Sequence, residues 1–140
     1  MRRILSIIIF SLVTLASCEL EVSDNGKLDG FWLIMTVDTV STGGSRYVAE
    51  EFNTWSFQYH ALQFRNAIGE VYITKINHPT ADSIIVSDVY HNENDTLVTD
   101  PLRLSSFGIS ALPDKFRILH LSDDELRLTD GVLTLNMRKY

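Results

Sequence analysis

The sequence predicts an all-β domain, a compact eight-stranded antiparallel up-and-down barrel with one or two short helices in its loops. Beyond residue 30 the apolar segments are short and rich in Val, Ile, Phe, Tyr and Thr. Several of them alternate apolar and polar residues, and polar turns separate them. Because a chain of 140 residues has room for a single core, residues 30–140 are expected to form one domain.

Eight segments fit the strands of such a barrel. They are residues 31–38, 54–59, 62–66, 71–76, 83–90, 115–121, 125–130 and 132–139. In the last of them, Leu133, Leu135 and Met137 alternate with Thr134, Asn136 and Arg138. This alternation predicts strands with one buried face and one wet face. Closure into a barrel would remove the exposed edges, whereas a two-sheet sandwich is the alternative on periodicity alone.

The turns between these strands have characteristic residues. Asp130 and Gly131 stand between the last two strands and predict a two-residue hairpin of type I′, in which both central residues have positive φ. Residues 77–82 and 92–95 are polar and predict two further loops.

Two stretches, residues 41–53 and 100–109, lack a clean alternation. A short helix is expected near residues 48–52 in the first. In the second, Asp100 followed by Pro101 predicts the start of a helix, because Asp caps helices and Pro suits the first helical position. We expect both stretches to act as lids or plugs.

The first 17 residues have the pattern of an export signal, in which a basic start precedes an apolar run and small residues. The apolar run covers residues 4–16, and its 13 residues are fewer than the roughly 20 that a membrane-spanning helix needs. The sequence therefore predicts a signal peptide over residues 1–17 rather than a transmembrane anchor.

The signal ends at the only cysteine of the chain, in Leu15-Ala16-Ser17-Cys18. This tetrad resembles the lipobox of bacterial lipoproteins. The resemblance implies cleavage before Cys18, thioether lipidation of its sulfur and acylation of its amino group with fatty acids such as palmitate. Residues 18–29 would then be the lipidated cysteine and a polar tether. The alternative is a free cysteine behind an ordinary signal peptide.

The same resemblance implies a location. Lipoproteins of this kind occur in Gram-negative bacteria, so the protein is expected to be anchored in the outer membrane, on its periplasmic or cell-surface face. The formal charge is −6, and removal of Arg2 and Arg3 with the leader leaves 10 basic and 18 acidic residues, or −8. Because binding to nucleic acid needs clustered Lys and Arg, we expect no nucleic-acid partner.

Gly30-Phe31-Trp32 opens the first predicted strand, and Arg138 lies near the end of the last one. This pair resembles the lipocalin signature, in which a G-x-W motif enters the first strand and a late arginine stacks on the tryptophan. The resemblance implies a lipocalin-like barrel over residues 30–140, closed at one end by Trp32 and Arg138. Such a cation–π contact contributes ~0.5–2 kcal/mol. Alternatively, Trp32 is an ordinary core residue and Arg138 a solvated one.

The sequence contains no motif for catalysis. The four histidines are isolated from one another, neither G-x-S-x-G nor H-E-x-x-H occurs, and a single cysteine cannot form a paired-cysteine metal site. We therefore predict no enzymatic activity, no metal and no cofactor.

The resemblance to lipocalins implies instead a small, partly apolar ligand inside the barrel. Aromatic side chains of the second, third and fourth strands are the expected walls: Trp55, Phe57, Tyr59, Phe64 and Tyr72. The alternative is an envelope or surface lipoprotein whose barrel is filled and whose outer face binds a protein partner.

Overall fold

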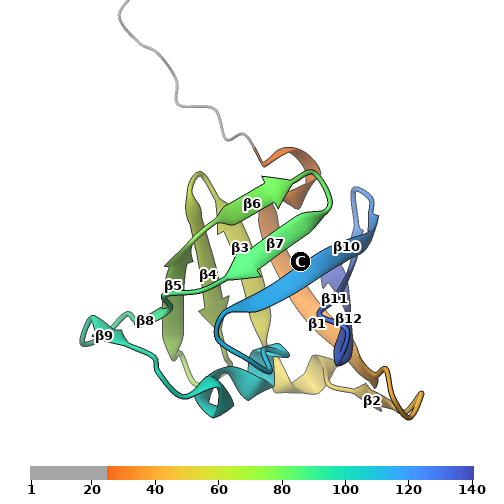
Figure 1. Ribbon diagram of the computed structural model, residues 1–140, viewed down its shortest axis with the longest axis horizontal. Helices are drawn as coiled ribbons and strands as arrows, with labels where there is room; N and C mark the ends of the chain where they lie inside the picture. The colour runs from red at the N-terminus through yellow and green to blue at the C-terminus, as the bar shows by residue number, and fades with distance from the viewer. Residues whose placement is uncertain (1–24) are drawn as a thin grey trace, which may run out of the picture.

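The computed structural model describes residues 25–140, so the predicted leader and Cys18 lie outside the described residues. Twelve antiparallel strands and three short 3-10 helices make up the domain (Figure 1). The elements are η1 (Gly26–Leu28), β1 (Gly30–Thr39), β2 (Ser45–Tyr47), η2 (Ala49–Glu51), β3 (Thr54–Gln58), β4 (Ala61–Arg65), β5 (Val71–Lys75), β6 (Asn77–Thr80), β7 (Ser83–Val86), β8 (Tyr90–His91), β9 (Thr96–Leu97), η3 (Pro101–Phe107), β10 (Asp114–Leu121), β11 (Glu125–Thr129) and β12 (Leu133–Lys139). Within this part of the chain, no helix has the length and apolarity needed to cross a membrane.

The all-β class is confirmed, but the predicted count of eight strands is wrong. All eight predicted segments contain a strand, and four further strands accompany them: β2, β6, β8 and β9. The additional strands are two to four residues long, and every residue of β2, β6 and β9 is exposed. A short strand without a buried face shows no alternation, so periodicity cannot reveal it. A loop was predicted for residues 77–82, which contain β6, because the exposed residues of this strand show no alternation.

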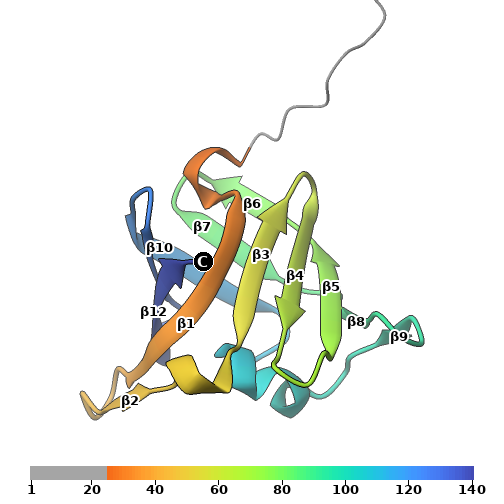
Figure 2. The same cartoon turned by 180° about the vertical axis from the view of Figure 1, so that it is seen from behind.

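The strands form one sheet that follows the predicted meander but does not close by hydrogen bonds. The order is β6-β7-β10-β11-β12-β1-β3-β4-β5-β8-β9, with β2 paired to β1. The last strand, β12, pairs along the first, as closure requires, and β1, β3, β4 and β5 run side by side (Figure 2). The sheet ends at β6 and β9, so the closed barrel is corrected to an open one.

The barrel opens where the chain crosses between the two ends of the sheet. After β5 the chain leaves β4 and enters β6, which pairs with β7. After β7 it crosses back to β8, which pairs with β5. We call these two crossings, residues 75–77 and 87–89, the seam. The predicted strand 83–90 is interrupted here, because Asp88 has a φ of 50° and cannot continue a strand.

The hairpin between β11 and β12 is confirmed, although its turn differs from the predicted type. Gly131 has a φ of 90°, but Asp130 is not among the residues with positive φ. The Asp130 carboxylate instead accepts hydrogen bonds from the backbone N–H groups of Val132 and Leu133, both at 2.8 Å. Strand β12 consequently starts at Leu133, and the loop is longer than two residues.

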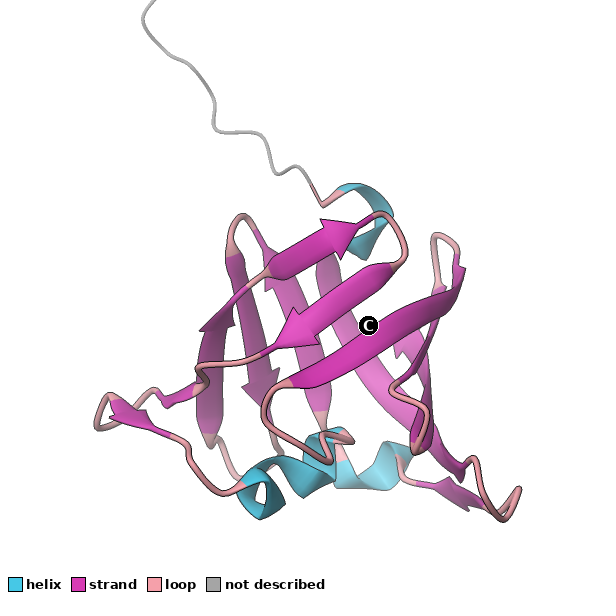
Figure 3. Ribbon diagram, viewed as in Figure 1, coloured by secondary structure: helices cyan, strands magenta, loops and turns pink. Residues whose placement is uncertain are grey.

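Short helices cover both ends of the barrel (Figure 3). At one end, Leu28 of η1 is buried and its carbonyl accepts a 2.8 Å hydrogen bond from the Trp32 indole. At the other end lie η2 and η3 (Figure 1). The predicted cap of η3 is confirmed, since the Asp100 carboxylate accepts a hydrogen bond from the N–H of Leu102 at 3.0 Å.

Aromatic side chains fill the interior. The Trp55 ring has edge-on contacts with Phe64 at 4.9 Å and with Phe116 at 5.2 Å between ring centroids. Its indole N–H donates to the Phe107 carbonyl of η3 at 3.0 Å, and Phe107 stacks obliquely on Phe64 at 5.5 Å. Because aromatic pairs contribute about 0.5–1.5 kcal/mol each beyond their burial, η3 is a plug held by the core, as predicted for its segment.

Candidate functional site

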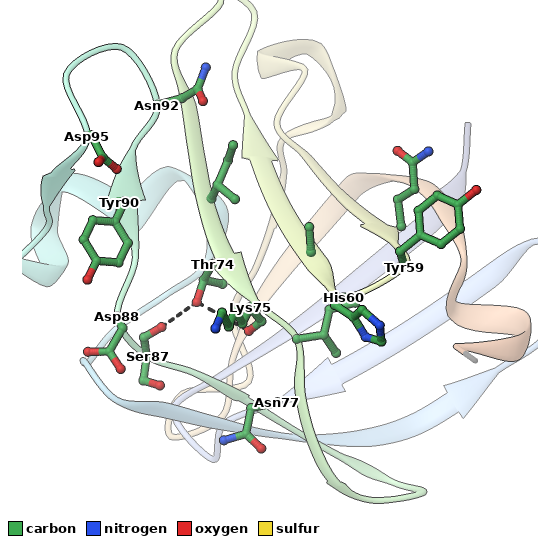
Figure 4. Close-up of a pocket in the computed structure, with 14 residues that line it drawn as sticks. Tyr59, His60, Thr74, Lys75, Asn77, Ser87, Asp88, Tyr90, Asn92 and Asp95 are labelled. Atoms are coloured by element: carbon green, nitrogen blue, oxygen red, sulfur yellow. Dashed lines mark hydrogen bonds between the residues drawn. The ribbon is translucent and has the colours of Figure 1, made fainter. Parts of the chain in front are cut away.

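A depression with a volume of about 1060 Å³ lies at the seam. We call it the seam groove. Its walls are the turn between β3 and β4, the strands β4 and β5, the start of β6, the crossing from β7 to β8, and the β8–β9 hairpin (Figure 4). The residues used below are Tyr59, His60, Ile73, Lys75, Asp88 and Tyr90.

The floor of the seam groove is the outer face of the sheet. On β5 the buried residues are Tyr72 and Thr74, which face the core, whereas Ile73 and Lys75 alternate with them and face outward. Ile73 is paired with Tyr90 of β8, so these two outward side chains adjoin one another. The groove therefore lies mainly on the outer face, and at the seam it is also lined by Thr74 and by Ile76, which packs against the core.

The groove combines aromatic, apolar and charged side chains. Tyr59 and Tyr90 lie on opposite sides of it (Figure 4), and they are 45% and 41% exposed. Lys75 supplies a positive charge, and Asp88 a negative one, at the seam. An open site with two tyrosine faces and a few polar groups suits a small molecule that is partly apolar and carries hydrogen-bonding groups.

The backbone around the groove is unusually strained. Phe52, Tyr59, Asp88 and Asp95 are the non-glycine residues of positive φ in the described chain, and the last three line the groove. A side chain with positive φ is held there by surrounding contacts, and such strain concentrates at functional sites. One of those contacts is a 2.5 Å hydrogen bond from the Thr74 hydroxyl to the Ser87 carbonyl, which ties β5 to the crossing segment (Figure 4).

Four of the five predicted ligand-binding residues lie elsewhere. Trp55, Phe57, Phe64 and Tyr72 are no more than 2% exposed and pack within the hydrophobic core. They fill the interior that they were expected to line. The fifth, Tyr59, leaves the inward face of its strand because β3 ends at Gln58 and Tyr59 turns with a φ of 54°. It is the one predicted ligand residue in the seam groove.

The predicted pairing of Trp32 with Arg138 is corrected to a pairing with Lys139. The Lys139 ammonium lies 4.8 Å from the centroid of the fully buried Trp32 ring. Cross-strand register explains the difference, because Trp32 pairs with Lys139, while Arg138 pairs with Leu33 and is exposed on the outer face. Gly30 has room for this lysine: a Cβ there would stand 3.2 Å from its Cε.

Elsewhere, a buried carboxyl group and a half-buried one share a network. Asp114, at the start of β10, and Asp130, in the β11–β12 turn, are hydrogen-bonded to each other, and the Ser110 hydroxyl donates to Asp130. Burial, together with the neighbouring Asp130 carboxylate, raises the pKa of Asp114 to about 6. Burial opposes ionisation of Asp130 too, but donors from Leu133, Ser110 and Val132 more than offset it and lower its pKa.

We expect this pair to make folding stability depend on pH. Folded Asp114 holds its proton up to about pH 6, whereas its ordinary value is 3.8, so stability falls as the pH rises between these values. The full shift corresponds to about 3 kcal/mol. The pKa of Asp130 is lowered, so its contribution is lost only in more acidic solution, as the pH falls through its folded-state value.

Asp114→Asn tests this linkage, because the amide keeps an acceptor for the Ser110 N–H and a donor for Asp130 but cannot ionise. Urea unfolding between pH 4.5 and 7.5 should show a flatter profile and about 1–2 kcal/mol greater stability at the upper end. Asp123→Asn, at a carboxylate that is 91% exposed, is the control and should keep the wild-type slope. An unchanged slope in Asp114→Asn would contradict the assignment.

The described residues contain no group of three or more His, Cys, Asp or Glu side chains that could hold a metal ion. His91 is buried and its Nδ1 lies 3.2 Å from the Asn94 amide oxygen, while His120 lies 3.7 Å from a Glu125 oxygen. Both histidines therefore have structural partners. His60 is exposed and belongs to the seam groove.

Sequence reasoning missed most of the seam groove. Ile73 and Lys75 were predicted only as members of the strand 71–76, and Asp88 and Tyr90 only as members of the strand 83–90. The groove lies where the chain crosses twice between β5 and β7, which do not pair by hydrogen bonds. Hydrophobic periodicity within a strand does not reveal such crossings. An exposed tyrosine close to a polar stretch, as in Tyr90 before residues 92–95, was the available signal.

Comparison with known proteins identifies the architecture. Residues 13–140 match the family described as a lipocalin-like domain. A lipocalin-like protein of Bacteroides uniformis is similar in structure, with a TM-score of 0.62 and 19% identity over 82% of this chain and 100% of that one. An uncharacterized protein of Bacteroides eggerthii gives a TM-score of 0.60 and 18% identity, over 81% and 99% of the two chains. No curated protein shows a significant match.

Proposed function

Because the chain belongs to the lipocalin-like domain family, we propose that it is a lipid-anchored binding protein that holds a small, partly apolar molecule in the seam groove. The family and the fold support a binding role in general. Lipocalin-like proteins are generally not enzymes, and the proposal accordingly involves binding without a catalytic step.

The observation that carries the proposal is the contrast between the packed interior and the open seam. The aromatic residues of the core are buried against one another and against the plug η3. Beside them, the seam groove has a volume of about 1060 Å³, exposed tyrosines and strained backbone. Sites for small molecules typically have volumes of ~300–1,000 Å³ and few polar groups, so the groove is large enough for such a ligand.

The anchor is supported by the sequence. The signal pattern and Leu15-Ala16-Ser17-Cys18 place the proposed lipid seven residues before Asn25, the first described residue. An extended chain spans at most about 3.5 Å per residue, so these seven residues reach roughly 25 Å. The proposed anchor would therefore hold the η1 end of the barrel close to the outer membrane, on its periplasmic or cell-surface side.

A filled barrel also supports a second candidate, an envelope or surface lipoprotein that binds a protein through its outer face. A contiguous exposed apolar patch in residues 102–112 would favour this candidate. Leu102 is 76% exposed, but Leu104, Phe107 and Ile109 are at most 1% exposed, so this segment does not provide one. The seam groove therefore makes the small-molecule role the better supported of the two.

The proposal predicts that the tyrosines of the groove carry affinity. In the mature chain with Cys18→Ser, Tyr59→Ala and Tyr90→Ala should each weaken binding of anilinonaphthalene sulfonate about tenfold, because each removes an aromatic contact. This probe combines apolar rings with an anion that Lys75 can pair. Fluorescence titration measures the affinity, and native mass spectrometry with a lipid and metabolite panel searches for the natural ligand.

Tyr47→Ala is the matched control, since Tyr47 is 62% exposed on β2 and does not line the groove. Its affinity for the probe should stay within about twofold of the parent chain. Equal losses in all three variants, or unchanged binding after both groove substitutions, would reject the groove as the site. If no molecule in the panel binds, the protein-binding candidate replaces the proposal.

A further inference from the structure

Three arginines form a diagonal row on the outer face of the barrel, away from the seam groove. Arg117 lies on β10, Arg127 on β11 and Arg138 on β12, and all three are exposed. We call this row the arginine stripe. Each residue alternates with buried neighbours, such as Phe116, Leu126 and Met137, so the three side chains share the outward face.

Strand register places them next to one another. Arg117 pairs with Thr129, which lies two residues beyond Arg127 on β11. Arg127 pairs with Asn136, which lies two residues before Arg138 on β12. Each step along the stripe is thus a diagonal between adjacent strands, a separation of about 7–8 Å that long side chains bridge readily.

The arginine stripe has one acidic neighbour in register, because Glu125 stands directly opposite Arg138 on the adjacent strand. Within the described part of the chain, none of the three arginines forms an ion pair with a carboxylate. The acidic groups of this face have other partners, because Asp38 accepts a 2.8 Å hydrogen bond from Asn136, and Glu125 lies beside His120. Three clustered guanidinium groups on a chain of net charge −6 form a local positive surface.

A depression lies at the end of the stripe formed by Arg127 and Arg138. Its volume is about 290 Å³, and its charged or titratable lining residues are Arg127, Arg138, His120 and Glu125. Guanidinium groups bind phosphate through paired N–H donors, more specifically than ammonium groups do. The two arginines therefore offer donors to a phosphate group at this depression, beside the Glu125 carboxylate that lies 3.7 Å from His120.

Exposed aromatic side chains adjoin the same end. Tyr140 is 73% and Phe31 is 52% exposed, and the backbone N–H of Tyr140 donates to the Phe31 carbonyl at 2.9 Å. This end also meets η1, because the Lys139 ammonium donates to the Lys27 carbonyl at 3.3 Å. Aromatic and basic residues side by side are typical of surfaces that rest on membranes.

We propose that the outer face bearing the arginine stripe, with Phe31 and Tyr140 at its end, docks onto an anionic, phosphate-bearing membrane surface. The inference extends the proposed function, since an anchor that joins the chain beside η1 would bring this face to the bilayer. Docking on this side leaves the seam groove, on the separate face formed by β4, β5 and β8, free to exchange its ligand.

The test uses the mature chain with Cys18→Ser, so that no lipid contributes, and vesicles of phosphatidylcholine with or without phosphatidylglycerol. We expect binding to the anionic vesicles only. The triple substitution Arg117→Gln, Arg127→Gln, Arg138→Gln should weaken it about 100-fold, because each basic residue near such a surface contributes about 1 kcal/mol. Arg138→Gln alone, which breaks no described hydrogen bond, should weaken it about fivefold and serves if the triple variant does not fold.

The matched control removes three arginines elsewhere: Arg46→Gln, Arg65→Gln and Arg103→Gln. Vesicle binding of this control should stay within about threefold of the parent, since the net charge changes equally but the stripe is intact. Equal weakening in both triple variants, or equal binding to neutral vesicles, would overturn the proposal. So would a dimer in sedimentation that the stripe variant abolishes. Ligand binding in the seam groove is measured separately with the anilinonaphthalene probe, so either proposal can fail alone.

Discussion

Gly108→Ala is expected to lower the free energy of unfolding by about 3–4 kcal/mol, a large part of the stability of a domain of this size. Gly108 ends the plug helix η3 with a φ of 76° and donates its N–H to the Ser105 carbonyl. Alanine disfavours this conformation by about 1–2 kcal/mol. An added Cβ would also lie 2.3 Å from a methyl group of Leu135, which is fully buried in β12. Relieving such overlap typically costs about 1–3 kcal/mol.

The two contributions to that loss can be separated by urea denaturation. Gly69→Ala is the matched control, because Gly69 has a φ of 88° but no atom within 4 Å of an added Cβ. It should cost only the conformational part, about 1–2 kcal/mol. In a double-mutant cycle, Leu135→Ala should relieve the overlap, so the double variant should be at least about 1 kcal/mol more stable than additivity predicts. Additive losses would show that η3 does not press on β12.

The overall fold could be predicted because its main strands, unlike most of the short ones, contain buried residues, and several of them have a single buried face. Alternation of apolar and polar residues, as in β11 and β12, reports which residues enter the core, and all eight predicted segments contain a strand. The four missed strands lack a buried face or are only two residues long. Closure of the barrel depended on these short strands. β6 pairs with β7 and β8 pairs with β5, so β5 and β7 do not pair with each other. Periodicity could therefore predict the meander but not the open seam.

The candidate site was harder to predict for the same physical reason. Alternation assigned Trp55 and Phe57 inward, but it cannot show whether an inward ring lines a cavity or fills one. Here Phe107 and Phe116, from distant parts of the chain, occupy the space. The alternation of β12 did place Arg138 outward, in conflict with its predicted stacking on Trp32, and Lys139, one residue later, takes that position. Periodicity within the strand was the better guide there.

Cys18→Ser is expected to have the largest effect on location, moving the protein from the membrane fraction to the soluble fraction. Each buried methylene of an acyl chain contributes about 0.8 kcal/mol, and a single myristoyl chain gives only marginal attachment. Three chains on Cys18 would hold the protein almost irreversibly, whereas the serine chain would keep none of them. Cell fractionation measures the distribution, and the mass of the processed protein reports whether the lipid is present.

A salt wash distinguishes the anchor from the arginine stripe. Electrostatic binding weakens as salt shortens the screening length to about 3 Å near 1 M, whereas acyl chains stay inserted. We expect the wild-type chain to remain in the membrane fraction after such a wash, and any Cys18→Ser chain held by the stripe to be released. Ser17→Ala, which keeps a small residue before the cysteine, should remain anchored. If Cys18→Ser stayed membrane-bound after the wash with an unchanged processed mass, the proposal of lipidation would be rejected. The seam groove would then have to be considered without a membrane anchor.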